Sequence, residues 1–185
     1  MTEFDLESEM HFITEPQCEF CKPETTELYK SINNGKPTKG GIRVVDYIRA
    51  QKTKNNRHVL RFIEAKDISD PKYLSIDEVA EKFSHSLQLF AAVMLNKRPD
   101  DKSEFEKFRK TYAKANFQMI LIIKTLQDYR LSNFEDALRQ KLKPLWKIWK
   151  LNPNQDILVW DEEKAIEQKL VRPQNICDNY NESKP

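Results

Sequence analysis

The chain is short of glycine, of cysteine and of long apolar runs, and each shortage excludes a class of protein. Only three of its 185 residues are glycine, which favours a helix-rich α/β chain over an all-β chain with many tight turns. Its three cysteines are too few for a disulfide framework, so we expect a protein of the reducing cytoplasm. No run of about eighteen apolar residues occurs, so we expect no membrane-spanning helix and no membrane partner.

An excess of charge of one sign and a targeting segment are also missing. The 31 basic and 29 acidic residues leave a formal net charge of +2, so any affinity for nucleic acid must come from local patches. The first residues, 1–5, are acidic and lack the basic-then-apolar order of a signal peptide. What the chain does have is 39% hydrophobic residues, in a length that predicts one domain over residues 1–185.

The stretch that carries chemistry is a predicted β-hairpin. Residues 44–48 and 60–66 are rich in β-branched, aromatic and aliphatic side chains, and the polar segment 51–56 lies between them. A turn near Thr53 or Lys54 would place Asp46 opposite position 61 or 62. Glu64 would then follow two or three residues further along. Directly opposed side chains lie about 5 Å apart and diagonal ones roughly 7–8 Å, so the two carboxylates can share one divalent ion.

The residue types at these positions suit one kind of chemistry. Two carboxylates are hard oxygen ligands of the sort that Mg²⁺ takes while it keeps several waters. Such an ion acidifies a bound water and neutralises charge that grows on a phosphoryl oxygen. Lys66 lies on the same strand face as Glu64 and can orient that water or stabilise the developing negative charge.

This pattern resembles that of a known family. Asp46, followed after seventeen residues by Glu64-Ala65-Lys66 at the end of an apolar strand, resembles the PD-(D/E)XK nuclease superfamily. The resemblance implies Asp46 and Glu64 as metal ligands, the Ala65 carbonyl as a further ligand, and Lys66 as the catalytic lysine. Val45 stands where the motif has proline.

The resemblance spans roughly residues 24–95 and implies a restriction-endonuclease-like α/β fold, with a mixed β-sheet flanked by helices. The core would occupy about 24–125, and a helical and strand extension 131–170. The implied activity is a Mg²⁺- or Mn²⁺-dependent nuclease that hydrolyses phosphodiester bonds in nucleic acid, DNA rather than RNA. Its setting would be prokaryotic or phage-related defence or DNA processing, as a homodimer or as a subunit of a larger complex.

The resemblance also suggests additional residues near the metal. In this family the first helix often carries an extra acidic residue, which here would be Glu27. A polar residue of the helix after the motif sometimes reaches the metal, and Gln88 or Lys82 would take that place here.

Two other interpretations of the motif stay open. Asp46 and Glu64 can be exposed residues on the open face of an ordinary hairpin. Alternatively, the fold can be an inactive version that binds nucleic acid or a protein partner. The other two Glu-x-Lys matches, at 162–164 and 167–169, lie in a charged, helix-like segment and read as a solvated face.

Capping and periodicity patterns predict the remaining elements. Ser75 and Glu78 form a capping box before an amphipathic helix that reaches Met94. The apolar run 117–123 is a buried strand, and a strand that follows helices and joins a hairpin sheet is the order that the restriction-endonuclease-like fold requires. Further predictions are a strand at 10–13, a helix from Pro23, a helix from Ser103 to about Ala115, a helix from Ser132 to about Trp149 kinked by Pro144, an edge strand at 156–160 and a helix capped by Asp161.

Two further segments have alternative interpretations. In 139–150, basic residues alternate with apolar ones and no acid occurs, so Lys141, Lys143 and Lys147 can contact phosphates while tryptophans stack on bases. Alternatively, the apolar side chains pack inward and lysine stems cover the edges. Cys18 and Cys21 have the spacing of half a zinc site, with His11 as a third ligand; a redox pair or two ordinary thiols are the alternatives.

Overall fold

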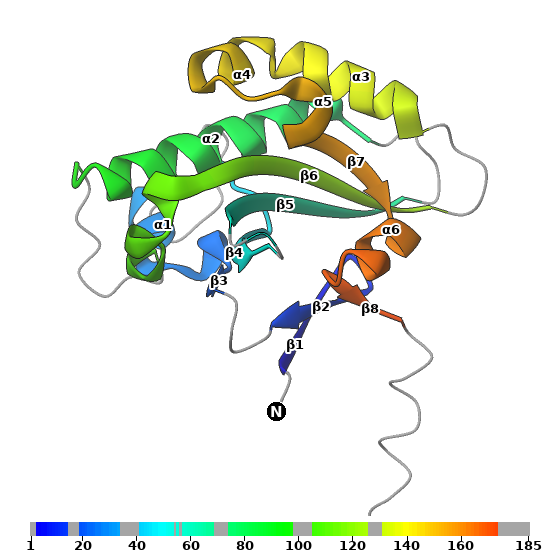
Figure 1. Cartoon of the computed structure of the whole chain (residues 1–185), viewed down its shortest axis with the longest axis horizontal. Helices are drawn as coiled ribbons and strands as arrows, with labels where there is room; N and C mark the ends of the chain where they lie inside the picture. Colours follow the sequence, from blue (N-terminus) through cyan, green and yellow to red (C-terminus); the bar gives the residue numbers. More distant parts are fainter. Residues whose placement is uncertain are drawn as a thin grey trace, which may run out of the picture.

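The computed structural model describes residues 3–14, 19–33, 41–53, 55, 57–68, 74–97, 105–125 and 131–173. Its strands form a five-stranded mixed sheet and a three-stranded antiparallel sheet, and helices flank them (Figure 1). The prediction of a mixed α/β fold with flanking helices is therefore confirmed. Within the described part of the chain, no helix is long and apolar enough to cross a bilayer.

The five-stranded sheet combines an antiparallel half with a parallel half. Its strands, in spatial order, are β3 (Glu19–Cys21), β4 (Tyr47–Lys52), β5 (His58–Ile68), β6 (Ala115–Thr125) and β7 (Ile157–Asp161). β3, β4 and β5 run antiparallel, whereas β5, β6 and β7 run parallel. β6 contains the predicted apolar run and has a strand on each side, and its residues Met119 to Ile123 are all buried. Such a continuous apolar strand is typical of a sheet covered on both faces.

One face of this sheet is covered by α2 (Ile76–Met94), which the capping pattern predicted. The Ser75 side chain accepts a hydrogen bond from the Glu78 backbone N–H at 3.2 Å. The apolar stripe of α2 packs on β5 and β6, with Phe90 edge-on to Phe62 at 5.7 Å between ring centroids. Two helices lie above α2, namely α3 (Leu131–Lys141) and α4 (Lys143–Trp149) (Figure 1).

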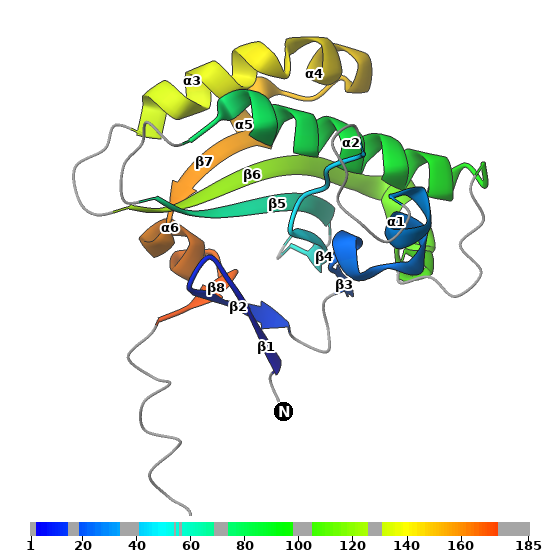
Figure 2. The same cartoon turned by 180° about the vertical axis from the view of Figure 1, so that it is seen from behind.

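The small sheet lies on the other side of the large one. It contains β1 (Glu3–Glu7), β2 (Met10–Thr14) and β8 (Val171–Arg172) in that order, and α6 (Glu162–Glu167) lies next to it (Figure 2). Between the two sheets is a second hydrophobic cluster, made of Met10, Phe12, Tyr47, Ile63, Ala65, Ile120, Ile122, Ala165, Leu170 and Val171. The N-terminal strands therefore cover the face of the large sheet that α2 leaves open.

Several shorter elements agree with the predictions. A 3₁₀ turn (η1, Pro23–Thr25) leads into α1 (Glu27–Ile32). Asp161 caps α6 by accepting the Lys164 N–H at 2.7 Å. Pro144 lies in the first turn of α4, and the helix breaks at Leu142 as expected. The short helix α5 (Pro153–Asp156) precedes β7, which lies at the edge of the sheet.

The prediction of an α-helix from Ser103 to Ala115 was wrong. Ser103 and Glu104 lie outside the described residues, and the chain after Phe105 forms two 3₁₀ turns, η3 (Glu106–Lys110) and η4 (Tyr112–Lys114). The buried side chains here are Phe105, Phe108 and Thr111, at steps of three residues. A 3₁₀ helix has three residues per turn and so puts all three on one side.

The predicted start of α3 was also wrong. The helix was expected to start at Ser132, but it already includes Leu131.

Candidate active site

The site lies at the start of β4, where the preceding residues do not pair with β5. The β4–β5 ladder ends at Tyr47 opposite Ile63, whereas β5 continues beside β6 as far as Ile68. Residues 43 and 45 turn instead toward α2, since the Arg43 N–H donates to His85 Nδ1 at 3.1 Å and the Val45 N–H donates to Ser86 Oγ at 2.8 Å. This departure leaves the edge of β5 open beyond Ile63.

The hairpin register differs from the predicted one by two to three residues. The Thr53 N–H donates to the Arg57 carbonyl at 2.7 Å, so the turn is centred further along the chain than expected. Tyr47 consequently lies opposite Ile63. The next position back, Asp46, comes level with Glu64 rather than with residue 61 or 62. The corrected register brings the two carboxylates closer together than the predicted one.

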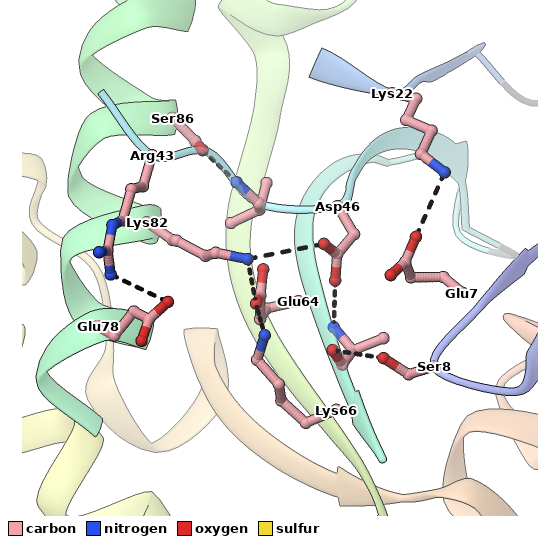
Figure 3. A network of polar contacts seen from close by, with 12 residues as sticks. Glu7, Ser8, Lys22, Arg43, Asp46, Glu64, Lys66, Glu78, Lys82 and Ser86 are labelled. Atoms are coloured by element: carbon pink, nitrogen blue, oxygen red, sulfur yellow. Dashed lines mark hydrogen bonds and ion pairs between the residues drawn. The ribbon is translucent and has the colours of Figure 1, made fainter. Parts of the chain in front are cut away.

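The Asp46 side chain pairs with the edge of β5 where the β4 backbone no longer does. Its Oδ2 accepts the Ala65 backbone N–H at 2.7 Å, a bond that the β4 backbone would have supplied in a longer ladder. The side chain is 9% exposed. Asp46 therefore closes the β5 edge with one carboxylate oxygen and leaves the other facing Lys82 of α2 (Figure 3).

Glu64 is the most deeply buried member of the site, with no exposed surface. Its Oε1 lies 2.6 Å from the Lys82 Nζ and 2.7 Å from the Lys66 Nζ. The same Lys82 Nζ lies 3.8 Å from Asp46 Oδ1, so both carboxylates face α2 from the same side of the sheet (Figure 3). Among the described residues, Glu64 Oε2 is buried without a hydrogen-bond partner.

Burial and proximity change the proton affinities of these groups. Burial, with the Glu64 charge adding to it, raises the pKa of Asp46 to about 7, against the opposing effects of Lys82 and of the Ala65 N–H. Burial alone would lower the pKa of the Lys82 ammonium, but the Glu64 and Asp46 carboxylates outweigh it and raise that pKa above its usual value. Two carboxylates and two ammonium groups thus share one partly closed site.

The oxygen atoms present fit a hard divalent cation. The candidate donors are Glu64 Oε2, Asp46 Oδ1 and the carbonyl of Ala65, and carboxylate and carbonyl oxygens are what Mg²⁺ and Mn²⁺ prefer. No group of three or more His, Cys, Asp or Glu side chains in the described ranges is arranged to hold a metal. A cation here would therefore keep several waters, as Mg²⁺ commonly does.

The structure does not bring the two additional predicted ligands to this site. The Glu27 side chain is 86% exposed and pairs with Lys30 at 2.8 Å, a pairing that lowers its pKa. Gln88 is exposed on α2, six residues beyond Lys82. Of the alternatives on that helix, Lys82 is the residue that reaches both carboxylates.

In the basic segment of α3 and α4, residues 139–150, most apolar side chains pack inward, whereas Ile148 is 76% exposed. Leu142 is buried, and Trp149 packs on Phe117 with ring centroids 5.5 Å apart. Lys141 pairs with Asp77 at 2.6 Å, while Lys143 and Lys147 are exposed on α4.

Of the two cysteines in the predicted half zinc site, one lies within the described residues. Cys21 is buried in β3, whereas Cys18 lies outside the described residues.

Three residues of the site have no signal in the sequence. Glu7 and Ser8 come from the N-terminal hairpin, where Ser8 Oγ donates to the Ala65 carbonyl at 3.1 Å and Glu7 pairs with Lys22 at 3.3 Å (Figure 3). Ser86 lies in the apolar stripe of α2, where it accepts the Val45 N–H. All three depend on contacts between distant parts of the chain, which no local pattern reveals.

A cavity of about 360 Å³ adjoins the site at Lys66. Between the end of β5 and the start of α2 it is lined by Lys66, Asp67, Ile68, Leu74, Ser75, Glu78 and Val79. Arg43 pairs with Glu78 at 3.0 Å on the same side of α2. The cavity thus reaches the charged cluster at Lys66, while Glu64 itself has no exposed surface.

In comparisons with known proteins, no family model, no curated protein and no solved structure matches this chain.

Proposed function

We propose that the chain is a Mg²⁺- or Mn²⁺-dependent nuclease that hydrolyses phosphodiester bonds in nucleic acid, with DNA as the expected substrate. The observation that carries this proposal is the arrangement of Asp46 and Glu64. They lie on adjacent segments and both face Lys82. Among the described residues, Glu64 Oε2 is buried without a hydrogen-bond partner, beside Lys66 and Lys82. Such clusters of perturbed, buried charges are enriched at functional sites.

Each residue of the site would have a separate role in binding the cation or the phosphate. Asp46, Glu64 and the Ala65 carbonyl would hold the cation, which when bound supplies charge neutralisation and a more acidic water. Lys66, whose side chain is 32% exposed, is the cation of the site that a phosphate can approach, and its ammonium would stabilise negative charge on phosphoryl oxygens. Lys82 would balance the carboxylates and fix their orientation from α2.

The order of elements supports the resemblance to PD-(D/E)XK nucleases. A hairpin carrying the aspartate and the Glu-x-Lys motif is followed by α2 and then by the parallel strand β6, the order that the restriction-endonuclease-like fold requires. Lys143 and Lys147 on the exposed side of α4 would add contacts to phosphates.

One observation favours a second candidate, an inactive module that binds nucleic acid or protein. Within the site, Lys66 and Lys82 match Asp46 and Glu64 one to one in charge, and both lysines contact Glu64 Oε1. A buried network of balanced charge can persist for structural reasons alone. The two candidates differ in whether the cluster accepts a cation.

Cleavage by isosteric variants distinguishes them. Asp46→Asn and Glu64→Gln keep the size of each side chain but remove the charge, so we expect Mg²⁺-dependent cleavage of labelled single- and double-stranded DNA to fall by about 100-fold or more. Binding of the same DNA, measured by fluorescence anisotropy, should stay close to that of the wild type.

The matched control is Glu163→Gln, an exposed carboxylate on α6 outside the cavity lining, which should cleave like the wild type. Cleavage by the wild type that does not depend on added Mg²⁺ or Mn²⁺, or equal rates in all four proteins, would contradict the nuclease proposal. DNA binding without any cleavage would support the binding module.

A further inference from the structure

The N-terminal hairpin reaches the proposed cation site from the opposite end of the sequence. β1 and β2 are joined by the two residues Ser8 and Glu9, and both have positive φ angles, 49° and 57°. Two consecutive non-glycine residues in this region are uncommon. They form the kind of tight turn whose twist suits a two-residue hairpin loop, and they place the Ser8 side chain at the edge of β5.

The Ser8 side chain contacts a backbone atom of the proposed cation site, the carbonyl oxygen of Ala65. Its hydroxyl donates to the Ala65 carbonyl at 3.1 Å, across 57 residues of sequence. The N–H and C=O of one strand residue point to the same edge, so this carbonyl faces the open edge where Asp46 takes the Ala65 N–H. Asp46 and Ser8 together replace both hydrogen bonds that a longer β4 would have made.

The turn is anchored on both sides of Ser8. Glu7 pairs with Lys22 at 3.3 Å, and both side chains are largely buried; Lys22 also lies 5.5 Å from the centroid of the Tyr47 ring. Glu9 pairs with Lys124 at the end of β6 at 3.3 Å. The negative charge of Glu7 reaches Asp46 and contributes to its raised pKa, so the end of β1 also brings negative charge to the open edge.

We propose that Ser8 is a positioning residue of the cation site, which orients the Ala65 carbonyl so that its second lone pair can bind a divalent ion. This inference rests on the proposed function, since it assumes that Ala65 is a ligand. A carbonyl oxygen has two lone pairs, and the Ser8 hydroxyl occupies one of them. Partners that fix a ligand in this way are worth about 10- to 100-fold in metal affinity.

The test is calorimetric titration of Mn²⁺ into the full chain and its turn variants. Ser8→Gly removes the hydroxyl and accepts a positive φ more easily than serine does, so the hairpin should fold at least as well, which a thermal melt checks. We expect its Mn²⁺ Kd to rise about 10-fold. Ser8→Asn, which tolerates the same φ and offers an N–H donor, should recover much of the affinity.

Glu9→Gly is the matched control, because Glu9 is in the same turn and has nearly the same φ but contacts Lys124 instead of Ala65. Its Mn²⁺ Kd should equal that of the wild type. A Kd unchanged in Ser8→Gly, or raised equally in Ser8→Gly and Glu9→Gly, would overturn the role of the hydroxyl while leaving the cation site in place. Failure of the wild type to bind Mn²⁺ would overturn the cation site itself.

Discussion

Glu64 is the residue of the site whose burial costs the most free energy of hydration. A carboxylate with no exposed surface loses its hydration, which costs several kcal/mol unless partners replace the water. Lys66 and Lys82 supply that replacement at one oxygen only, and the second oxygen is left bare among the described residues. A purely structural ion pair would gain from satisfying both oxygens, so the bare one is the feature that a bound cation would explain.

Asp46 gives stability a dependence on pH that can be measured. Its pKa is raised from 3.8 to about 7 in the fold, so between these values the folded protein binds a proton that the unfolded chain has released. The free energy of unfolding should therefore fall as pH rises through this window, by up to roughly 4 kcal/mol, and this contribution is fully present only below the lower value.

Urea unfolding at about pH 4, 5.5 and 8 in metal-free buffer, with wild type and Asp46→Asn in parallel, isolates this contribution. The variant should lack that part of the slope and should be at least as stable as the wild type at the highest pH. If the difference between the two proteins does not change with pH, the raised pKa is refuted.

At the scale of elements, α2 both covers the sheet and supplies a charged residue. Its apolar stripe packs on β5 and β6, while Lys82, Ser86 and His85 contact the site and the segment before β4. Periodicity predicts the stripe well, because it depends on spacing along one helix. Which polar residue of α2 meets the carboxylates depends on how the helix is placed over the sheet, and the sequence left Lys82 and Gln88 as equal alternatives.

The first turn of α2 offers a test of this element. Ser75→Ala removes the oxygen that accepts the Glu78 N–H at 3.2 Å, and loss of such a cap should lower the free energy of unfolding by about 1 kcal/mol. Ser84→Ala is the matched control, because the Ser84 hydroxyl donates to the Ala80 carbonyl within the same helix and such back-bonding does not stabilise helices. Equal losses in the two variants, measured by urea unfolding, would argue against the cap.

Turn geometry explains the main error in the predicted hairpin. A strand on each side of the loop was predicted from β-branched and aromatic residues. The first was expected at 44–48 and lies instead at Tyr47–Lys52, because the loop holds no glycine that would fix the turn position. The register was therefore open, and a shift of the turn moves every cross-strand pair. The prediction that Asp46 and Glu64 lie near each other survives the shift, since the corrected register places them level.

For the molecule as a whole, the helices that cover the large sheet could be predicted from the sequence, but most of the small sheet on its other face could not. The helix-covered face was predictable from amphipathic helices and the apolar run of β6. Of the small sheet, only a strand at residues 10–13 was predicted. β8 has two residues, and β1 and β8 meet only through β2; pairing between the two ends of a chain leaves no local pattern.

The N-terminal sheet should therefore contribute to global stability. Phe12 is 2% exposed, and its ring lies 4.5 Å from that of Tyr47 in the second cluster. Phe12→Ala should lower the free energy of unfolding by about 3–4 kcal/mol. Ile13→Ala, at a half-buried position on the other face of β2, should cost clearly less. A small and equal effect of both substitutions in urea unfolding would show that the sheet is peripheral to folding.

The hydrogen bond from Ala65 to Asp46 also makes one backbone amide a reporter on the site. Most amides of a central strand donate to another backbone carbonyl, but this one donates to a carboxylate at 2.7 Å. Its proton resonance should therefore respond directly to the ionisation of Asp46 and to any ion that withdraws electron density from that carboxylate. In a two-dimensional amide spectrum, a single peak would read the state of the site without any substitution, substrate or assay of cleavage.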